Sequence, residues 1–134
     1  MMKKDLFLFA AAVLIFFVVG CKKQNSEINV NSSTPSGTWI GTGQYGTSPT
    51  YPFTLIFKTN GTVDITGNNG TGADNATGTW QVTGDKVIST YRYSGSSADY
   101  TLSGGFSQSN RIMIGTIGLG TATTGAGSFD VTRQ

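Results

Sequence analysis

From Gly37 onward, apolar residues alternate with polar ones in short runs, as they do in strands that bury one face. Turn signals separate these runs at intervals of about a dozen residues. Asn60-Gly61 and Gly84-Asp85 are the clearest, because glycine adopts the positive φ that a tight hairpin needs. No run repeats with the period of an amphipathic helix. The pattern predicts eight strands, at Gly37–Tyr45, Tyr51–Lys58, Thr62–Thr66, Thr77–Thr83, Lys86–Tyr93, Ser97–Phe106, Arg111–Ile117 and Gly127–Arg133.

The connections between these runs indicate how the strands are arranged. Short connections favour antiparallel neighbours. Open edges on such strands would invite pairing with other chains, and closing the sheet on itself removes them. We therefore expect an all-β domain over residues 37–134, a small eight-stranded antiparallel up-and-down barrel. A loop rich in glycine and asparagine is expected at Gly67–Asn75.

Alternation also assigns the two faces of each strand. If Gly84-Asp85 is a two-residue turn, Val82 and Val87 pair on one face. The outer face is expected to carry Asp64, Asp99 and Asp130 together with the apolar residues Ile40, Ile56, Met113 and Ile117. The inner face is expected to carry Trp39, Phe53, Leu55, Phe57, Val63, Ile65, Trp80, Val82, Val87, Ser89, Tyr91, Tyr93, Ala98, Tyr100, Leu102, Gly104, Phe106, Ile112, Ile114, Phe129 and Val131.

The amino-terminal segment has the layout of a secretion signal. Lys3 and Lys4 precede an unbroken apolar run, Leu6–Val19, of about 14 residues, whereas a membrane-spanning helix needs about 20. The run ends in Val18-Val19-Gly20-Cys21. This sequence resembles the bacterial lipobox, which has an aliphatic residue three positions before the cysteine and a small residue directly before it. The resemblance implies that residues 1–20 are a signal peptide, that Cys21 receives a lipid, and that the lipid anchors the protein to a membrane.

Residues 21–36 follow the predicted cleavage point and are polar, with serine, asparagine and a proline, as in a flexible tether. Lys22 stands where inner-membrane retention signals of the enteric family have aspartate. This resemblance implies a place in the bacterial cell envelope, at the outer membrane. The alternatives are an uncleaved signal anchor and a soluble secreted protein with a free thiol. A free exposed cysteine would be a liability in an oxidising compartment, which favours lipidation.

Composition narrows the classes of function. Charged residues make up 12% of the chain and its net charge is +2, so there is no broad basic surface to hold nucleic acid. The chain has no histidine and one cysteine, which removes the commonest general base and any disulfide within the chain. We expect no catalytic residues, no cofactor and no enzyme activity. We also expect no metal site, because Asp74 alone supplies too few carboxylate oxygens for calcium.

Gly37-Thr38-Trp39, at the start of the first predicted strand, resembles the Gly-x-Trp signature of lipocalins and their bacterial lipocalin-like relatives. Gly78-Thr79-Trp80 repeats it. In that family an arginine near the end of the last strand packs across the first tryptophan, which implies a contact between Arg133 and Trp39. The chain is shorter than a full lipocalin and lacks the family's carboxy-terminal helix and disulfides, which argues against a large cavity. The avidin-like barrel has a similar opening tripeptide and is the alternative relative.

The residues expected inside the barrel are rich in aromatic side chains. An eight-stranded barrel is just wide enough to be filled by side chains or to hold one small ligand. The rings therefore either fill the interior or line a pocket for a small apolar or amphipathic ligand, with tyrosine hydroxyls near one mouth. A further alternative is binding of an envelope protein on the outer surface, as an accessory factor or an enzyme inhibitor. The candidate ligand-binding residues are Trp39, Phe53, Phe57, Trp80, Tyr91, Tyr93, Tyr100, Phe106 and Phe129.

Overall fold

The computed structural model describes residues 34–68, 72–107, 109 and 111–134. The chain divides into two compact units, Met1–Val30 and Asn31–Gln134, and all described residues belong to the second. The predicted signal peptide, the predicted lipidation site Cys21 and most of the predicted tether therefore lie outside the described residues. Within the described part of the chain, no helix is long and apolar enough to cross a membrane.

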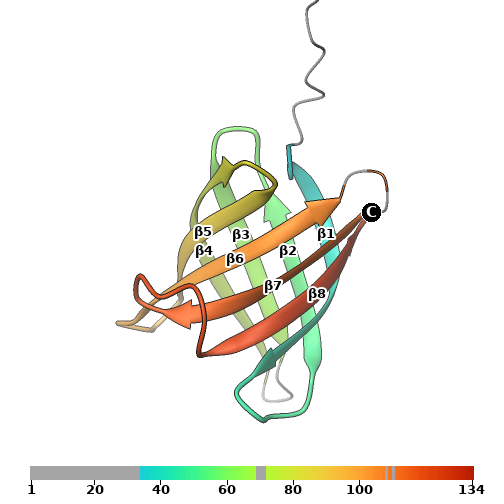
Figure 1. The fold of residues 1–134 in the computed structure, drawn as a ribbon. Coiled ribbons are helices and arrows are strands. Elements are labelled where there is room, and N and C mark those ends of the chain that lie inside the picture. The colour runs from blue at the N-terminus through green and yellow to red at the C-terminus, as the bar shows by residue number, and fades with distance from the viewer. Residues whose placement is uncertain (1–33, 69–71, 108, 110) are drawn as a thin grey trace, which may run out of the picture. The chain divides into compact units, whose positions relative to one another are not determined.

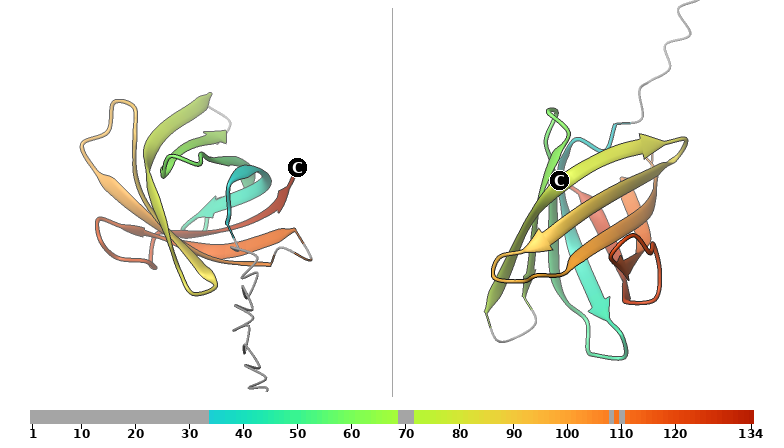
Figure 2. Two further views of the ribbon diagram at one scale, coloured as in Figure 1. Left: turned by 90° about the horizontal axis from the view of Figure 1, so that it is seen from above. Right: turned by 90° about the vertical axis from the view of Figure 1, so that its left-hand side faces the viewer.

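The described residues form a closed antiparallel barrel in which each strand pairs with the next and β8 returns to pair with β1 (Figures 1 and 2). This confirms the predicted fold class. The eight strands of the closed barrel all lie within residues 37–133. The strands are β1 (Gly37–Tyr45), β2 (Tyr51–Phe57), β3 (Thr62–Asn68), β4 (Ala73–Thr83), β5 (Lys86–Tyr93), β6 (Asp99–Ser107), β7 (Ile112–Leu119) and β8 (Gly127–Arg133).

The β3–β4 hairpin extends further than the sequence predicted. The prediction ended the third strand at Thr66 and left Gly67–Asn75 as a loop, yet the two strands remain paired as far as Asn68 opposite Ala73. Asp74 and Asn75 therefore belong to β4. The reason is that this end of the barrel is open to solvent. Ala73, Asp74 and Asn75 are exposed, and the buried residue Gly67 has no side chain, so the hairpin has no apolar alternation to reveal it there.

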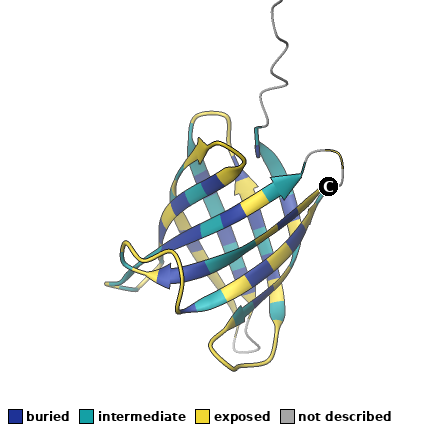
Figure 3. Ribbon diagram, in the orientation of Figure 1, coloured by how far each residue is buried: buried dark blue, intermediate teal, exposed yellow. Residues whose placement is uncertain are grey.

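Burial alternates along the strands, as Figure 3 shows in the change from dark blue to yellow. Side chains on the inner face pack into one core, and each large apolar side chain buried in this way contributes about 1.5–3 kcal/mol relative to exposure. Val82 shares the inner face but is 37% exposed, because β3 pairs with β4 only as far as Thr79. The buried apolar residues are Trp39, Phe53, Leu55, Phe57, Val63, Ile65, Ala76, Val87, Tyr91, Leu102, Met113, Ile117, Ala126, Phe129 and Val131.

Strand β7 faces the opposite way from the prediction. Met113 and Ile117 are 0% and 1% exposed and point inward, whereas Ile112 and Ile114 are 39% and 59% exposed. Met113 lies opposite Val131 of β8, which is itself buried in the core. The prediction was wrong because β7 carries apolar residues at both alternating positions. The sequence then does not show which face is buried, and a shift of one residue in the register exchanges the two faces of the whole strand.

The first and last strands close the barrel through Trp39 and Arg133, which lie opposite each other in the β1–β8 pairing. The Cζ atom of Arg133 is 5.8 Å from the centre of the Trp39 ring, and the arginine Nη2 donates a hydrogen bond to the carbonyl of Ser36. The indole Nε1 donates to the carbonyl of Pro35 at 2.7 Å. These contacts confirm the contact that the resemblance implied, and they tie the chain entering β1 to the end of β8.

Replacing Arg133 with alanine is expected to lower the free energy of unfolding by about 1–2 kcal/mol, from the lost cation–π contact and the lost hydrogen bond to Ser36. Urea unfolding monitored by tryptophan fluorescence measures it. Arg92→Ala is the control, because Arg92 is exposed and pairs with Asp99 on the outer surface at 2.7 Å. Its effect should be smaller. Equal losses in the two variants would show that Arg133 has no special part in closing the barrel.

Ser89 is the one inward residue whose hydroxyl is buried without a hydrogen-bond partner among the described residues. It is 0% exposed and lies between Val87 and Tyr91 on β5. A buried hydroxyl without a partner costs about 1–3 kcal/mol of desolvation.

Ser89→Ala is therefore expected to raise the melting temperature by a few degrees, since it removes one oxygen and leaves only a small void. Thermal unfolding followed by circular dichroism tests this. A fall in melting temperature would mean that the hydroxyl is satisfied in solution.

Candidate functional site

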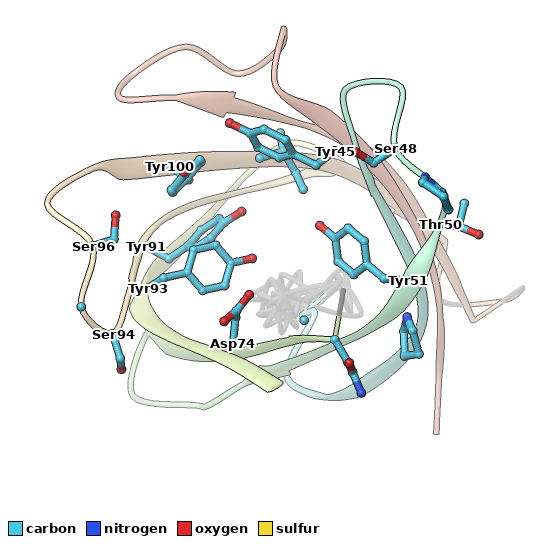
Figure 4. A pocket seen from close by; sticks show the side chains of 16 residues that line it. Tyr45, Ser48, Thr50, Tyr51, Asp74, Tyr91, Tyr93, Ser94, Ser96 and Tyr100 are labelled. Carbon is cyan, nitrogen blue, oxygen red and sulfur yellow. The ribbon is translucent and has the colours of Figure 1, made fainter. Parts of the chain in front are cut away.

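One end of the barrel holds a pocket of about 940 Å³. The pocket opens among the ends of β1, β3 and β5 and the starts of β2, β4 and β6, at the opposite end from the Trp39–Arg133 contact. Pockets for small molecules are typically about 300–1,000 Å³. The lining residues are Tyr45, Ser48, Pro49, Thr50, Tyr51, Pro52, Gly67, Asn68, Asp74, Tyr91, Tyr93, Ser94, Gly95, Ser96, Tyr100 and Ile117 (Figure 4).

All five tyrosines of the chain line this pocket. Tyr91 and Tyr100 are stacked with ring centres 5.7 Å apart, and Tyr93 meets both rings edge-on at 5.6 Å. Tyr45 makes a further edge contact with Tyr100 at 6.3 Å. Such aromatic pairs add about 0.5–1.5 kcal/mol each beyond the area that they bury. The cluster therefore forms a firm wall on the β5–β6 side of the pocket.

Tyr51 forms the facing wall, and two glycines make room for its ring. A Cβ atom at Gly43, which lies opposite Tyr51 in the β1–β2 pairing, would stand 2.9 Å from the Tyr51 Cε2. A Cβ atom at Gly67 would stand 3.3 Å from the same Cε2 and 3.7 Å from the Tyr93 hydroxyl. Gly67 thus lies between the two walls, and the space above it exists because it has no side chain.

Polar groups converge on the middle of the pocket. Figure 4 shows the hydroxyls of Tyr51, Tyr91 and Tyr93 pointing toward one another across it, with the carboxylate of Asp74 directed inward from the edge beside Tyr93. Asp74 reaches this position because β4 begins at Ala73 and places it, like Ala76 and Trp80, on the inner face. The site thus combines apolar ring surface with hydrogen-bonding groups, which suits an amphipathic molecule.

Burial controls the ionisation of the tyrosines. Desolvation is the largest cause that raises the pKa of Tyr91 and Tyr93 well above the ordinary value of 10.0, followed by the hydroxyl of a neighbouring tyrosine, Tyr93 or Tyr51 respectively. Desolvation, Tyr45 and Asp74 raise the pKa of Tyr51 in the same way. These phenols therefore stay neutral at physiological pH.

The predicted ligand-binding residues separate into two groups. Tyr91, Tyr93 and Tyr100 line the pocket. The other six pack elsewhere in the barrel, where four are buried in the core and two are partly buried against it, namely Trp39, Phe53, Phe57, Phe129, Trp80 and Phe106. Phe57 and Trp80 form an edge contact at 5.8 Å, and the Trp80 Nε1 donates to the Lys58 carbonyl, so these rings cap the packed end. Aromatic rings thus fill one end of the barrel and line a pocket at the other, and ligand binding in that pocket stays a prediction.

The prediction missed Tyr45, Tyr51 and Asp74. Tyr51 carried a usable signal, because it alternates in phase with Phe53, which was assigned to the inner face. Asp74 carried none, since it lay in a segment predicted to be a loop. Tyr45 is 44% exposed at the end of β1. At a strand end, alternation does not show whether a side chain faces the pocket mouth or the outer surface.

The pocket has the size and the mixed apolar and polar lining that are typical of small-molecule sites. Among the described residues, no three histidine, cysteine, aspartate or glutamate side chains gather closely enough to hold a metal ion. The chain contains no histidine that could activate the hydroxyls of Ser48, Ser94 or Ser96 at the mouth.

Comparison of the chain with protein-family models, with curated proteins and with solved structures finds no match.

The raised tyrosine pKa values predict a loss of stability at alkaline pH. Between pH 10 and the higher pKa of the folded state, the unfolded chain binds fewer protons than the folded one, so stability falls as pH rises. At pH 11 each strongly shifted tyrosine is expected to cost about 1.4 kcal/mol. Urea unfolding at pH 8 and pH 11 should show a smaller loss in Tyr91→Phe than in the wild type. Equal losses would mean that Tyr91 ionises normally in the folded protein.

Proposed function

We propose that the protein is an envelope-anchored binding protein whose barrel takes a small amphipathic ligand into the tyrosine-lined pocket. The observation that carries this proposal is the pocket itself, of about 940 Å³ and lined by every tyrosine of the chain. A barrel that served only as a packed scaffold would be filled by side chains at both ends, because voids between bulky residues are costly. Here one end is packed and the other is open.

The barrel geometry agrees with attachment through the amino terminus. The lipobox-like Val18-Val19-Gly20-Cys21 supports a lipid on Cys21, and the residues after it support a tether. Residues 34–36 enter the barrel beside Arg133 (Figure 1). The pocket lies at the other end of the barrel, so the chain does not enter the barrel through the pocket mouth. We propose the outer membrane as its location and a lipocalin-like ancestry for the barrel.

The alternative is a protein-binding role for the outer surface. Exposed isoleucines on β1, β2 and β7 favour it, namely Ile40, Ile56, Ile112 and Ile114 at 38–59% exposure. Ile40 and Ile112 lie on either side of Thr132 of β8, so two of them belong to one surface. Isolated surface apolar residues are common in proteins, so the pocket is the stronger observation.

Native mass spectrometry of the chain from Ser26 onward, after incubation with an envelope lipid extract, tests the proposal. We expect a discrete added mass in the wild type. Gly67→Val should abolish it, because a side chain there enters the space between Tyr51 and Tyr93. Gly105→Val is the matched control, since it adds the same group where no atom lies within 4 Å. A bare wild-type mass, or an adduct that survives Gly67→Val, would contradict pocket binding and favour the outer surface.

A further inference from the structure

The pocket is lined by aromatic rings and by one acidic side chain. Among the described residues that line it, Asp74 is the only one of the Asp, Glu, Lys and Arg class. Its carboxylate raises the pKa of Tyr93 and Tyr51, after the larger effects of desolvation and of neighbouring tyrosines, so it lies electrostatically close to both. The pocket therefore has a negative charge at one edge and neutral phenol rings around it.

This combination distinguishes between three kinds of ligand. An anionic ligand could accept hydrogen bonds from the tyrosine hydroxyls, but it would be repelled by Asp74 with no Lys or Arg among the described lining residues to offset this. A neutral apolar ligand would bury the carboxylate further without bringing a charge or a hydrogen-bond donor to it. A cationic ligand would form an ion pair with the carboxylate. The faces of aromatic rings, which carry the negative part of the ring quadrupole, also attract cations.

We propose that the pocket selects an amphipathic ligand with an organic cation, an ammonium or quaternary ammonium group, held between Asp74 and the rings of Tyr93 and Tyr51. Figure 4 shows these three side chains around one part of the cavity, with Tyr45 and Tyr100 farther round the mouth. The apolar part of the ligand then lies against Tyr45 and Tyr100. The inference rests on the proposed function, because it names the chemical class of ligand for the same pocket.

Two probes of equal shape separate charge from apolar contact. Benzyltrimethylammonium is cationic, and neopentylbenzene is its neutral isostere with carbon in place of nitrogen. Chemical shifts of 13C-labelled tyrosine rings report binding at this site alone, because all five tyrosines line the pocket. Titrations use the chain from Ser26 onward, which contains the whole closed barrel.

Asp74→Asn preserves the shape of the side chain and removes its charge. We expect it to weaken binding of benzyltrimethylammonium about fivefold or more, as the loss of one close charge pair near the surface implies, and to leave neopentylbenzene binding unchanged. Asp130→Asn is the matched control, because Asp130 is exposed on the outer face of β8. It should change neither affinity.

The outcomes separate the two proposals. If both probes shift the tyrosine signals and Asp74→Asn affects neither, the selection for a cation is wrong while binding in the pocket stands. Tighter binding of benzylsulfonate than of the cation would overturn the selection in the same way. If no probe shifts the tyrosine signals and the native mass spectra show no adduct, both proposals fail together.

Discussion

Closure of β8 onto β1 is the constraint on which the rest of the structure depends. Every strand contributes its inner face to one shared core, and that core is sealed only because the first and last strands pair from Trp39–Arg133 to Tyr45–Gly127. Without this pairing, two long edges with unsatisfied backbone groups would be exposed to solvent and to other chains. The tryptophan, buried at the packed end and held by Arg133 and the Pro35 carbonyl, joins the start of the fold to its end.

Closure also fixes how much space the interior offers, and the side chains divide that space unevenly. At the packed end, Trp39, Phe57 and Trp80 fill the interior with rings that are predominantly apolar. The aromatic residues that line the pocket are all tyrosines, Gly67 leaves space between Tyr51 and Tyr93, and Gly43 makes room for the Tyr51 ring. The change from large apolar rings to phenols and glycines along the barrel accounts for one packed end and one end with a pocket.

The sequence was sufficient for the architecture because two signals agreed. Alternation placed residues such as Phe53 and Val131 on the inner face, and glycine turns separated the strands, so closure followed from short connections. Alternation could not assign the inner face of β7, because Ile112, Met113 and Ile114 are all apolar. Only pairing with the neighbouring strands decides which of them is buried. Local pattern cannot carry information that resides in the register between strands.

The pocket was only partly predictable, for a related reason. The aromatic residues were recognisable, but their division between core and pocket depends on how far along the barrel axis each one lies. That distance follows from the stagger between neighbouring strands, and the alternation of apolar and polar residues does not reveal the stagger. Asp74 shows the limit most clearly, since its role depends on the extension of β3 and β4 past the point where their apolar pattern stops.

An even number of strands running up and down returns the chain to the end at which it began. In this barrel that end is the packed one, where residue 34 enters and Arg133 leaves. The hairpins that surround the pocket mouth are therefore all internal connections, none of which carries a chain terminus. A protein fused directly before residue 34 or after Gln134 would meet the packed end of the barrel. Changes in the length or sequence of the mouth loops would leave the contact between Trp39 and Arg133 in place, because that contact lies at the other end.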